Sequence, residues 1–430
     1  MNKITQSMIK AAERVLIVVV DKHKPRELWT ADDIVEEMKE LVMTCNGEVI
    51  DAIIARIKIE TAGTLIGSGK VAEIAQLCQL KAIDTAVFSY DLKGSQQRNL
   101  EEAIKAKTID RTQLILDIFA RHAKSSEGKI QVELAQLEYL KPRLVGHGIE
   151  LSRLGGGIGT LGPGETKLET DRRRIEERIT RLRHDLKDIA ASHSLTRKKR
   201  KGKGVPIISL IGYTNAGKST LLNALTDAHQ VTKDALFTTL DSLSRQFTLP
   251  NHQKVILSDT VGFLRELPHH LIESFKTTLD EVREADLLLH VVDVSHPQFR
   301  NMIDSVDKVL AELKVLHKPV IMVFNKIDQL SDQRWFKGLV DNFRHAVCVS
   351  ALKGDNMDEL TNQIGAMLSS MMLEINVNVP MNRMDLVNLA HEQGSVISIK
   401  YYDDHINIRA NIPLTLEGKF PMERKDEDDE

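Results

Sequence analysis

The chain has 430 residues, 42% hydrophobic and 28% charged, which is long enough for about two to four domains and typical of a folded globular protein. Its formal net charge of −3 favours no partner, so electrostatic arguments must be made for individual segments. The three cysteines, Cys45, Cys78 and Cys348, are scattered without CxxC spacing. This pattern argues against a disulfide framework or a zinc site and fits a reducing compartment.

Residues 1–110 alternate short β-branched runs (VLIVVV, EVIDAIIARI, TAVFSY) with amphipathic helical patterns, which predicts a small α/β domain. One helix is predicted to start after the cap Thr30, with Asp33 as its capping-box partner. The apolar run Val15 to Val20 is far shorter than the ~20 residues of a membrane span. We therefore expect a buried strand here, not a signal peptide or anchor, and a cytoplasmic protein.

The segment IGSGKVAEIAQ carries Gly67, Gly69 and Lys70 ahead of a predicted helix. Glycines and a lysine at a helix start can bind a phosphate, which would make this a second nucleotide site. A short GxGK is more often an ordinary strand-to-helix turn, and the sequence favours that interpretation.

Residues 111–204 lose the strand signal and are predicted to form an antiparallel helical hairpin. Apolar residues recur at heptad intervals on each of the two predicted helices. They are Ile130, Leu134, Leu137 and Leu144 on the first, and Leu168, Ile175, Ile179, Leu182, Leu186 and Ile189 on the second. Between them, residues 155–165 (GGGIGTLGPGE) have a glycine density that predicts a non-helical tip. The run from Arg197 to Gly204 (RKKRKGKG) is interpreted as an exposed linker.

The second half of this hairpin is strongly basic. Residues 165–203 contain 14 Lys or Arg against 7 Asp or Glu. A basic rod suits contact with the phosphates of folded RNA, with an affinity that falls steeply with salt. The alternative is a solvated spacer, and with only 4% aromatic residues single-strand base stacking is not expected.

Residues 205–372 resume clear strand and helix alternation, beginning with PIISLIGYTNAGKSTLLNAL. Gly212, Gly217, Lys218 and Ser219 fit G-x-x-x-x-G-K-[ST] between a strand and a helix. The glycines turn backbone N–H groups onto phosphates, the lysine reaches the β- and γ-phosphates, and the serine hydroxyl can ligate Mg²⁺.

The segments that follow specify guanine. NKID ends a strand about 110 residues after the P-loop, and its Asp328 can accept from two donors that adenine does not offer. Lys326 can lie along the base, and in CVSALKG the backbone at Ser350 and Ala351 can meet guanine O6. VILSDTVGF places Asp259 to hold Mg²⁺ through water and Gly262 to donate its N–H to the γ-phosphate.

The loop LFTTLDS offers Thr239 as the residue that closes over the metal, with Thr238 as its competitor. These segments have the order and spacing of a Ras-like G domain with a doubly wound, mostly parallel sheet. The catalytic candidates are Lys218, Thr239 and Gly262, and the metal candidates are Ser219, Thr239 and, through water, Asp259. The full set of predicted GTP-binding residues is Gly212, Tyr213, Thr214, Asn215, Ala216, Gly217, Lys218, Ser219, Thr220, Phe237, Thr238, Thr239, Leu240, Asp241, Asp259, Thr260, Val261, Gly262, Asn325, Lys326, Ile327, Asp328, Ser350, Ala351 and Leu352.

Phe263 stands where Ras-like enzymes usually carry the glutamine that orients water. Its side chain cannot hydrogen-bond to water, so we expect slow intrinsic hydrolysis that depends on a partner. Residues 373–430 predict a small α+β domain with a strand (EINVNVP), a helix (MDLVNLAHEQ) and a hairpin turning at Asp403 and Asp404. The final KDEDDE is interpreted as a solvated acidic tail.

GYTNAGKSTL, LFTTLD, DTVGF, NKID, IDRTQLILDIFARHAKSSEGKIQVELAQL and GGGIGTLGPGETKLETDRR together closely resemble the HflX family of translational GTPases. The resemblance covers about residues 50–370 and implies an N-terminal α/β domain, a helical hairpin, a G domain and a small C-terminal domain. It also implies binding to the large ribosomal subunit and splitting or rescue of stalled or idle ribosomes under stress. The resemblance places Mg²⁺ on Ser219 and Thr239, phosphates on Gly212 to Ser219 and Gly262, and guanine on Asn325, Lys326 and Asp328.

Asn215 matches an asparagine that some related GTPases use to hold K⁺, which gives a second, hypothetical cofactor. The partners expected are GTP or GDP and the large subunit, reached through the basic hairpin and the N-terminal domain of a monomer. Alternatives are an RNA-modification or ribosome-assembly GTPase and a scaffold that uses GTP only as a structural ligand. A modifying enzyme would need a second catalytic centre, and the N-terminal part shows no Cys-His pair or Ser-His-Asp arrangement.

Overall fold

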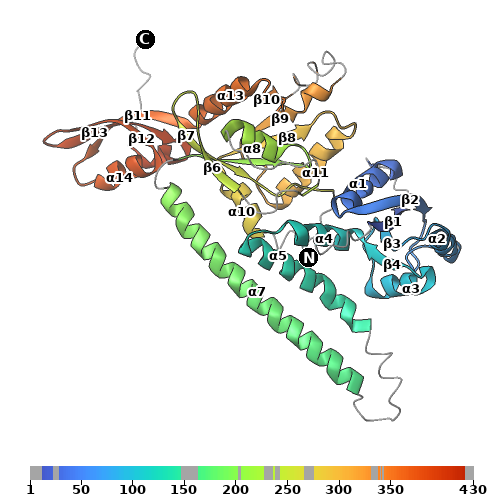
Figure 1. Ribbon diagram of the computed structural model, residues 1–430. Helices are drawn as coiled ribbons and strands as arrows, with labels where there is room; N and C mark the ends of the chain where they lie inside the picture. The colour runs from blue at the N-terminus through green and yellow to red at the C-terminus, as the bar shows by residue number, and fades with distance from the viewer. Residues whose placement is uncertain are drawn as a thin grey trace, which may run out of the picture.

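The computed structural model describes residues 12–22, 29–146, 163–201, 205–226, 236–237, 243–265, 276–330, 338, 340 and 343–421. These residues form a four-stranded, a six-stranded and a three-stranded sheet. Figure 1 shows the three sheets with α5 and the long helix α7 extending away from them. The multidomain α/β class expected from the sequence is confirmed.

The N-terminal sheet is parallel, in the order β2-β1-β3-β4. Its elements are β1 (Glu13–Asp21), α1 (Ala31–Thr44), β2 (Gly47–Arg56), α2 (Ser68–Leu80), β3 (Thr85–Phe88), α3 (Gly94–Ile104) and β4 (Lys107–Asp110). Val15 to Val20 are buried in the central strand because helices cover both faces of the sheet. Helix α1 starts at the predicted capping box of Thr30 and Asp33.

The GxGK segment forms the start of α2. Gly67 is the N-cap, and the Lys70 ammonium pairs with Glu73 of the same helix at 2.9 Å. The segment is thus a helix start that lies eleven residues after the end of β2 at Arg56, and not the strand-to-helix turn that the sequence favoured.

The helices that follow are α4 (Arg111–His122), α5 (Ser126–Leu140), the 3-10 turn η1 (Lys141–Gly146) and α7 (Pro163–Lys201). Helix α4 packs on the N-terminal sheet, because Leu114, Ile115 and Phe119 share a core with Ile17. Helices α5 and α7 run antiparallel (Figure 1). Their predicted seam is confirmed at Leu134, Ile179, Leu182 and Leu186, with Ile130, Leu137 and Ile175 packed beside them.

Three details of this region differ from the prediction. Helix α5 ends at Leu140, since Pro142 cannot continue it, and Leu144 therefore lies in η1 outside the seam. Helix α7 starts inside the glycine-rich segment, where Pro163 takes the first helical position that proline favours. The helix also continues through Lys201, because lysine and arginine are good helix formers, so the linker prediction was wrong for residues 197–201.

The six-stranded sheet has the order β10-β9-β8-β5-β7-β6 and is parallel except for β6, which confirms the doubly wound G-domain prediction. Its elements are β5 (Ile207–Gly212), α8 (Lys218–Thr226), β6 (Leu243–Thr248), β7 (Lys254–Asp259), α10 (Lys276–Glu284), β8 (Leu287–Asp293), α11 (Phe299–Glu312), β9 (Val320–Asn325), η2 (Ile327–Gln329), β10 (Ala346–Cys348) and α13 (Met357–Ser370). The order reverses beside β5, so the carboxyl ends of β5, β7, β8 and β9 surround one crevice, where ligands bind in such sheets.

The last sheet is antiparallel, in the order β11-β13-β12. It comprises β11 (Met372–Pro380), α14 (Met384–Gln393), β12 (Ser395–Tyr401), β13 (His405–Pro413) and the 3-10 turn η3 (Leu414–Lys419). The predicted strand, helix and hairpin are confirmed, while the acidic tail lies outside the described residues. Across the part of the chain that is described, no helix combines the length and apolar character needed to cross a membrane.

Candidate active site

The P-loop connects β5 to α8 and contains two positions that only glycine can fill. Gly212 and Gly217 have φ angles of +150° and +91°, which side chains rarely adopt. A Cβ at Gly212 would lie 2.2 Å from the carbonyl oxygen of Val291, and one at Gly217 would lie 2.2 Å from Nδ2 of Asn325. The backbone is therefore pressed against β8 and β9, with the N-terminus of α8 directed at the crevice.

Lys218 is buried at the start of α8. Its Nζ donates to the carbonyl oxygens of Gly212 at 3.2 Å and Tyr213 at 2.8 Å, so the ammonium lies inside the loop. Burial lowers the pKa of Lys218 to about 8, while the nearby Asp259 carboxylate opposes that shift. A buried cation gains from an anion beside it, and a phosphate group would supply one.

Ser219 and Asp259 meet at the position predicted for a metal. The Ser219 hydroxyl donates to Oδ2 of Asp259 at 2.6 Å, and Asp259 is fully buried at the end of β7. A hydroxyl and a carboxylate oxygen are hard ligands of the kind that Mg²⁺ prefers. The donor set therefore fits Mg²⁺.

The segment after β7 runs alongside the P-loop. The backbone N–H of Thr214 donates to the Phe263 carbonyl at 2.8 Å, and the N–H of Phe263 donates to the Gly212 carbonyl at 3.1 Å. A Cβ at Gly262 would lie 2.8 Å from Cγ2 of Thr214 and 3.1 Å from Nζ of Lys218. Glycine is thus required, and its peptide lies beside the lysine that is predicted to hold the γ-phosphate.

The Phe263 side chain points away from the phosphate position. It is 1% exposed and belongs to a core cluster with Ile207, Ile211, Leu279 and Val282. Replacing it with a polar residue would bury an amide among aliphatic side chains. The position cannot supply a group that orients water while this packing holds.

Asn325, at the end of β9, connects two loops of the site. Its Nδ2 donates to the Ala216 carbonyl at 2.9 Å, and its Oδ1 accepts the N–H of Ala351 at 3.0 Å. Asp328 accepts from the Ser350 hydroxyl at 2.7 Å. The P-loop, NKID and SALKG segments are therefore brought together as the sequence spacing predicts.

Lys326 has a left-handed backbone with φ +65°, and its ammonium lies 2.5 Å from Oδ2 of Asp293 at the end of β8. Leu352, two positions after the fully buried Ser350, is 77% exposed. Of the remaining predicted residues, Thr260 donates its hydroxyl to the Leu210 carbonyl at 2.7 Å. Thr238, Thr239, Leu240 and Asp241 lie outside the described residues.

Two predicted nucleotide contacts, Tyr213 and Phe237, have side chains that face the N-terminal domain. The Tyr213 hydroxyl donates to Oε1 of Glu37 at 2.6 Å and accepts the N–H of Arg265 at 3.1 Å. Burial, and next the Glu37 carboxylate, raise the pKa of Tyr213 well above its usual value, so the hydroxyl keeps its proton. Glu37 also pairs with the buried Arg111 at 3.1 Å.

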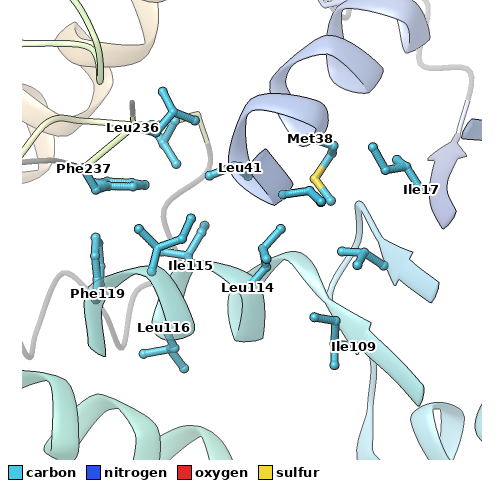
Figure 2. Close-up of a cluster of buried hydrophobic side chains, with 14 of the residues drawn as sticks. Ile17, Met38, Leu41, Ile109, Leu114, Ile115, Leu116, Phe119, Leu236 and Phe237 are labelled. Carbon is cyan, nitrogen blue, oxygen red and sulfur yellow. The ribbon is translucent and has the colours of Figure 1, made fainter. Parts of the chain in front are cut away.

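Figure 2 shows Leu236 and Phe237 against Leu41 of α1 and Phe119 of α4. The rings of Phe119 and Phe237 meet edge to face, with centroids 4.6 Å apart. The segment that precedes Thr238 and Thr239 is thus anchored on the N-terminal domain. Sequence reasoning missed this contact, since nothing in a local pattern pairs residues so far apart.

Sequence reasoning also missed Asp293 and Glu37. Asp293 could have been noticed because it ends the buried run LLLHVVD, and the carboxyl ends of parallel strands line the ligand crevice. Glu37 carried no such signal, because a glutamate in an amphipathic helix is usually solvated.

The doubly wound sheet, the buried P-loop lysine, the serine and aspartate at the metal position and the joined NKID and SALKG segments define a P-loop GTPase. Comparison with known families gives four matches along the chain: "GTP-binding GTPase N-terminal" (residues 32–120), "GTP-binding GTPase Middle Region" (122–200), "50S ribosome-binding GTPase" (207–326) and "HflX C-terminal domain" (338–426). The chain belongs to the HflX family of GTPases, as the sequence motifs indicated, and is a hydrolase of GTP.

Curated relatives are similar over nearly the whole chain. A GTPase HflX of Caldanaerobacter subterraneus subsp. tengcongensis is 41% identical over 415 residues, which are 96% of this chain and 94% of the relative. The GTPase HflX of Lacrimispora saccharolytica is 42% identical over 94% of both chains. That of Escherichia coli is 40% identical over 82% of this chain and 84% of its own.

Proposed function

We propose that this GTPase is a translational switch that binds the large ribosomal subunit and splits or rescues stalled or idle ribosomes under stress. The observation that carries the proposal is the basic rod formed by α7, whose residues 163–201 include 13 basic and 7 acidic residues. The match to a family described as a 50S ribosome-binding GTPase supports the same partner. GTP hydrolysis measured with and without purified large subunits tests the proposal.

The charges of α7 have two different surroundings. Arg178 and Arg183 pair with Glu133 and Glu138 of α5 at 2.7 and 2.8 Å, so part of the charge holds the hairpin together. Arg173 and Arg174 pair within α7, with Glu177 at 3.6 Å and Asp171 at 3.7 Å, and their side chains are 79% and 81% exposed. Exposed arginines on a rigid rod are suited to phosphate contacts along a groove of folded RNA.

In this proposal Lys218, Thr239 and Gly262 act on the γ-phosphate. Lys218 and the Gly262 N–H bind its oxygens, while Asp328 and Lys326 hold the base and Asn325 joins the base to the phosphate loop. When GTP is bound, Thr239 and Gly262 are ordered around the γ-phosphate, and hydrolysis releases them. The ordered form binds the ribosome, and the released form leaves it.

Ser219 and Asp259 would hold Mg²⁺, with Thr239 completing the set when GTP is bound. The ion would supply positive charge that offsets the negative charge of the phosphate groups. Asn215, with φ +61° in the P-loop, is proposed to help hold K⁺ beside the phosphates. GTP turnover that is unchanged when Na⁺ replaces K⁺ would exclude that second ion.

Ser219→Ala is expected to weaken Mg²⁺-dependent binding of GTP by about tenfold to a hundredfold, because the hydroxyl that faces Asp259 is removed. The measurement is a Mg²⁺ titration of the affinity for a non-hydrolysable GTP analogue. Ser244→Ala, on the exposed side of β6, serves as the matched control. An unchanged Mg²⁺ dependence would show that the metal position is misassigned.

Replacing Lys198, Lys199, Arg200 and Lys201 with glutamine should flatten the salt dependence of binding to large subunits. Four lost phosphate contacts would reduce the slope of log affinity against log salt by about three to four. Glutamine at four exposed lysines outside the hairpin is the control (Lys105, Lys308, Lys314 and Lys400). Equal slopes for the two variants would assign the run a purely structural role in α7.

We propose a division of the chain into an N-terminal α/β domain (1–110), a hairpin (111–204), a G domain (205–372) and a C-terminal domain (373–430). The hairpin and the N-terminal domain provide the ribosomal contacts. The protein is further proposed to act as a monomer in the cytoplasm. The three scattered free cysteines support the cytoplasmic location, because thiols stay reduced in that compartment.

A further inference from the structure

The loop after β8, residues 293–298, lies between the guanine-binding segment and helix α1 of the N-terminal domain. Asp293 is paired in register with Asn325, and the N–H of Val294 donates to the Asn325 carbonyl at 3.1 Å. The loop therefore starts directly beside NKID. It ends at Gln298, the residue that precedes α11.

At the start of the loop, Asp293 determines where the Lys326 ammonium lies. Oδ2 of Asp293 is 2.5 Å from Nζ of Lys326, and Oδ1 accepts from the backbone N–H and the hydroxyl of Ser295 at 3.0 and 2.5 Å. The side chains of Asp293 and Lys326 are largely buried, with exposed fractions of 13% and 20%. A lysine has many rotamers, and this ion pair selects one of them.

The end of the loop is fastened to α1. Nε2 of Gln298 donates to Oδ1 of Asp33 at 3.0 Å, although the two residues are 265 positions apart. The other oxygen of Asp33 accepts the backbone N–H and the hydroxyl of Thr30 at 2.8 and 2.7 Å in the capping box. One carboxylate thus caps α1 and holds the loop.

The middle of the loop is fixed by its own contacts. Nδ1 of His296 accepts the backbone N–H of Gln298 at 3.0 Å. Burial lowers the pKa of His296, so the ring is neutral at neutral pH and can accept this bond. Hydrogen bonds thus hold the loop at Asp293, at His296 and at Gln298.

We propose that Asp293 is a positioning residue that aims Lys326 along the guanine base, and that α1 holds this arrangement through the Gln298–Asp33 hydrogen bond. Contact with the N-terminal domain then slows the release of GDP and of GTP to the same extent, because it acts on the base that both share. The inference rests on the guanine site proposed above. Partner binding that pulls α1 away would hasten exchange of either nucleotide.

Dissociation rates of fluorescent GDP and of a fluorescent non-hydrolysable GTP analogue from the full chain test this inference. Gln298→Glu places two carboxylates together and should accelerate release of both nucleotides about tenfold, the effect of losing one hydrogen bond to a charged group. Asp293→Asn should accelerate both similarly by freeing Lys326. Gln253→Glu, in the turn before β7 at the opposite edge of the sheet, is the matched control.

The double variant Asp33→Asn with Gln298→Glu reverses donor and acceptor. The new amide keeps one oxygen for the Thr30 cap and donates its NH₂ to the new carboxylate, so release should return to within about twofold of the original rate. This rescue separates a specific contact from general damage to the fold.

Three results would overturn the proposal. The first is release of both nucleotides from Gln298→Glu at the original rate. The second is a double variant whose release rates stay as high as those of Gln298→Glu. The third is faster release of the GTP analogue alone, which would place the coupling at the γ-phosphate. Failure of the guanine site is distinguished by Asp328→Asn. If that variant keeps its preference for GTP over xanthosine triphosphate, the base site itself is misassigned and the positioning role fails with it.

Discussion

Asp328→Asn is expected to turn a GTP-binding protein into one that prefers xanthosine triphosphate. The Asp328 carboxylate is held at the crevice by the Ser350 hydroxyl at 2.7 Å, where it can accept from the ring N–H and the amine of guanine. The amide of asparagine cannot accept from both, but it can donate to the carbonyl oxygen that xanthine carries in place of the amine. Leaving such groups unpaired changes the selectivity between the two nucleotides by about 10⁴ to 10⁵.

The measurement is competition of the two unlabelled triphosphates against fluorescent GDP. Asp358→Asn, on an exposed position of α13, controls for the loss of one negative charge. GTP preference that survives in Asp328→Asn would contradict the guanine site, and with it the assignments of Lys326 and Asn325.

Large ribosomal subunits are expected to accelerate GTP hydrolysis by about 10³ to 10⁵, the size of assistance in trans in other GTPases, or about 4 to 7 kcal/mol of barrier. The reason is the place of Phe263, which is 1% exposed in an aliphatic core and offers nothing that can align water. The intrinsic rate should therefore be low, and the partner must supply the missing alignment.

Single-turnover hydrolysis with large subunits, small subunits or neither measures this ratio. Gly262→Ala is the matched variant, because its Cβ would collide with Thr214 and crowd Lys218, so stimulation should be lost. Phe263→Gln is a poor test, since burying an amide in that core costs about 1 to 3 kcal/mol of stability whatever its effect on water. A stimulation below about tenfold would contradict the proposed switch.

The nucleotide motifs could be predicted from sequence because their spacing is local and their residue types are dictated by chemistry. Gly212 and Gly217 are examples, since each needs a φ angle and a close approach that glycine alone allows. The heptad seam of the hairpin was predictable for the same reason. Helix ends were not, and Pro163 and Lys201 show that a glycine-rich or basic run can belong to a helix when its neighbours extend it.

The contacts between domains could not be predicted from sequence. Tyr213 and Glu37 are 176 residues apart, and neither residue type indicates in the sequence which residue it will contact. A tyrosine in a P-loop can contact a nucleotide. In this structure α1 packs beside the loop, and the Tyr213 hydroxyl donates to Glu37 on that helix instead. The same applies to Phe237, whose partner Phe119 lies on α4.

The side chain of Asn325 makes the two halves of the nucleotide site thermodynamically dependent on each other. Its Nδ2 donates to the Ala216 carbonyl of the phosphate loop, and its Oδ1 accepts the N–H of Ala351 in the guanine-binding segment. Ordering one loop by a bound base therefore lowers the entropy cost of ordering the other around phosphate. Guanosine and pyrophosphate added as separate molecules should bind cooperatively, each strengthening the other through a single amide group.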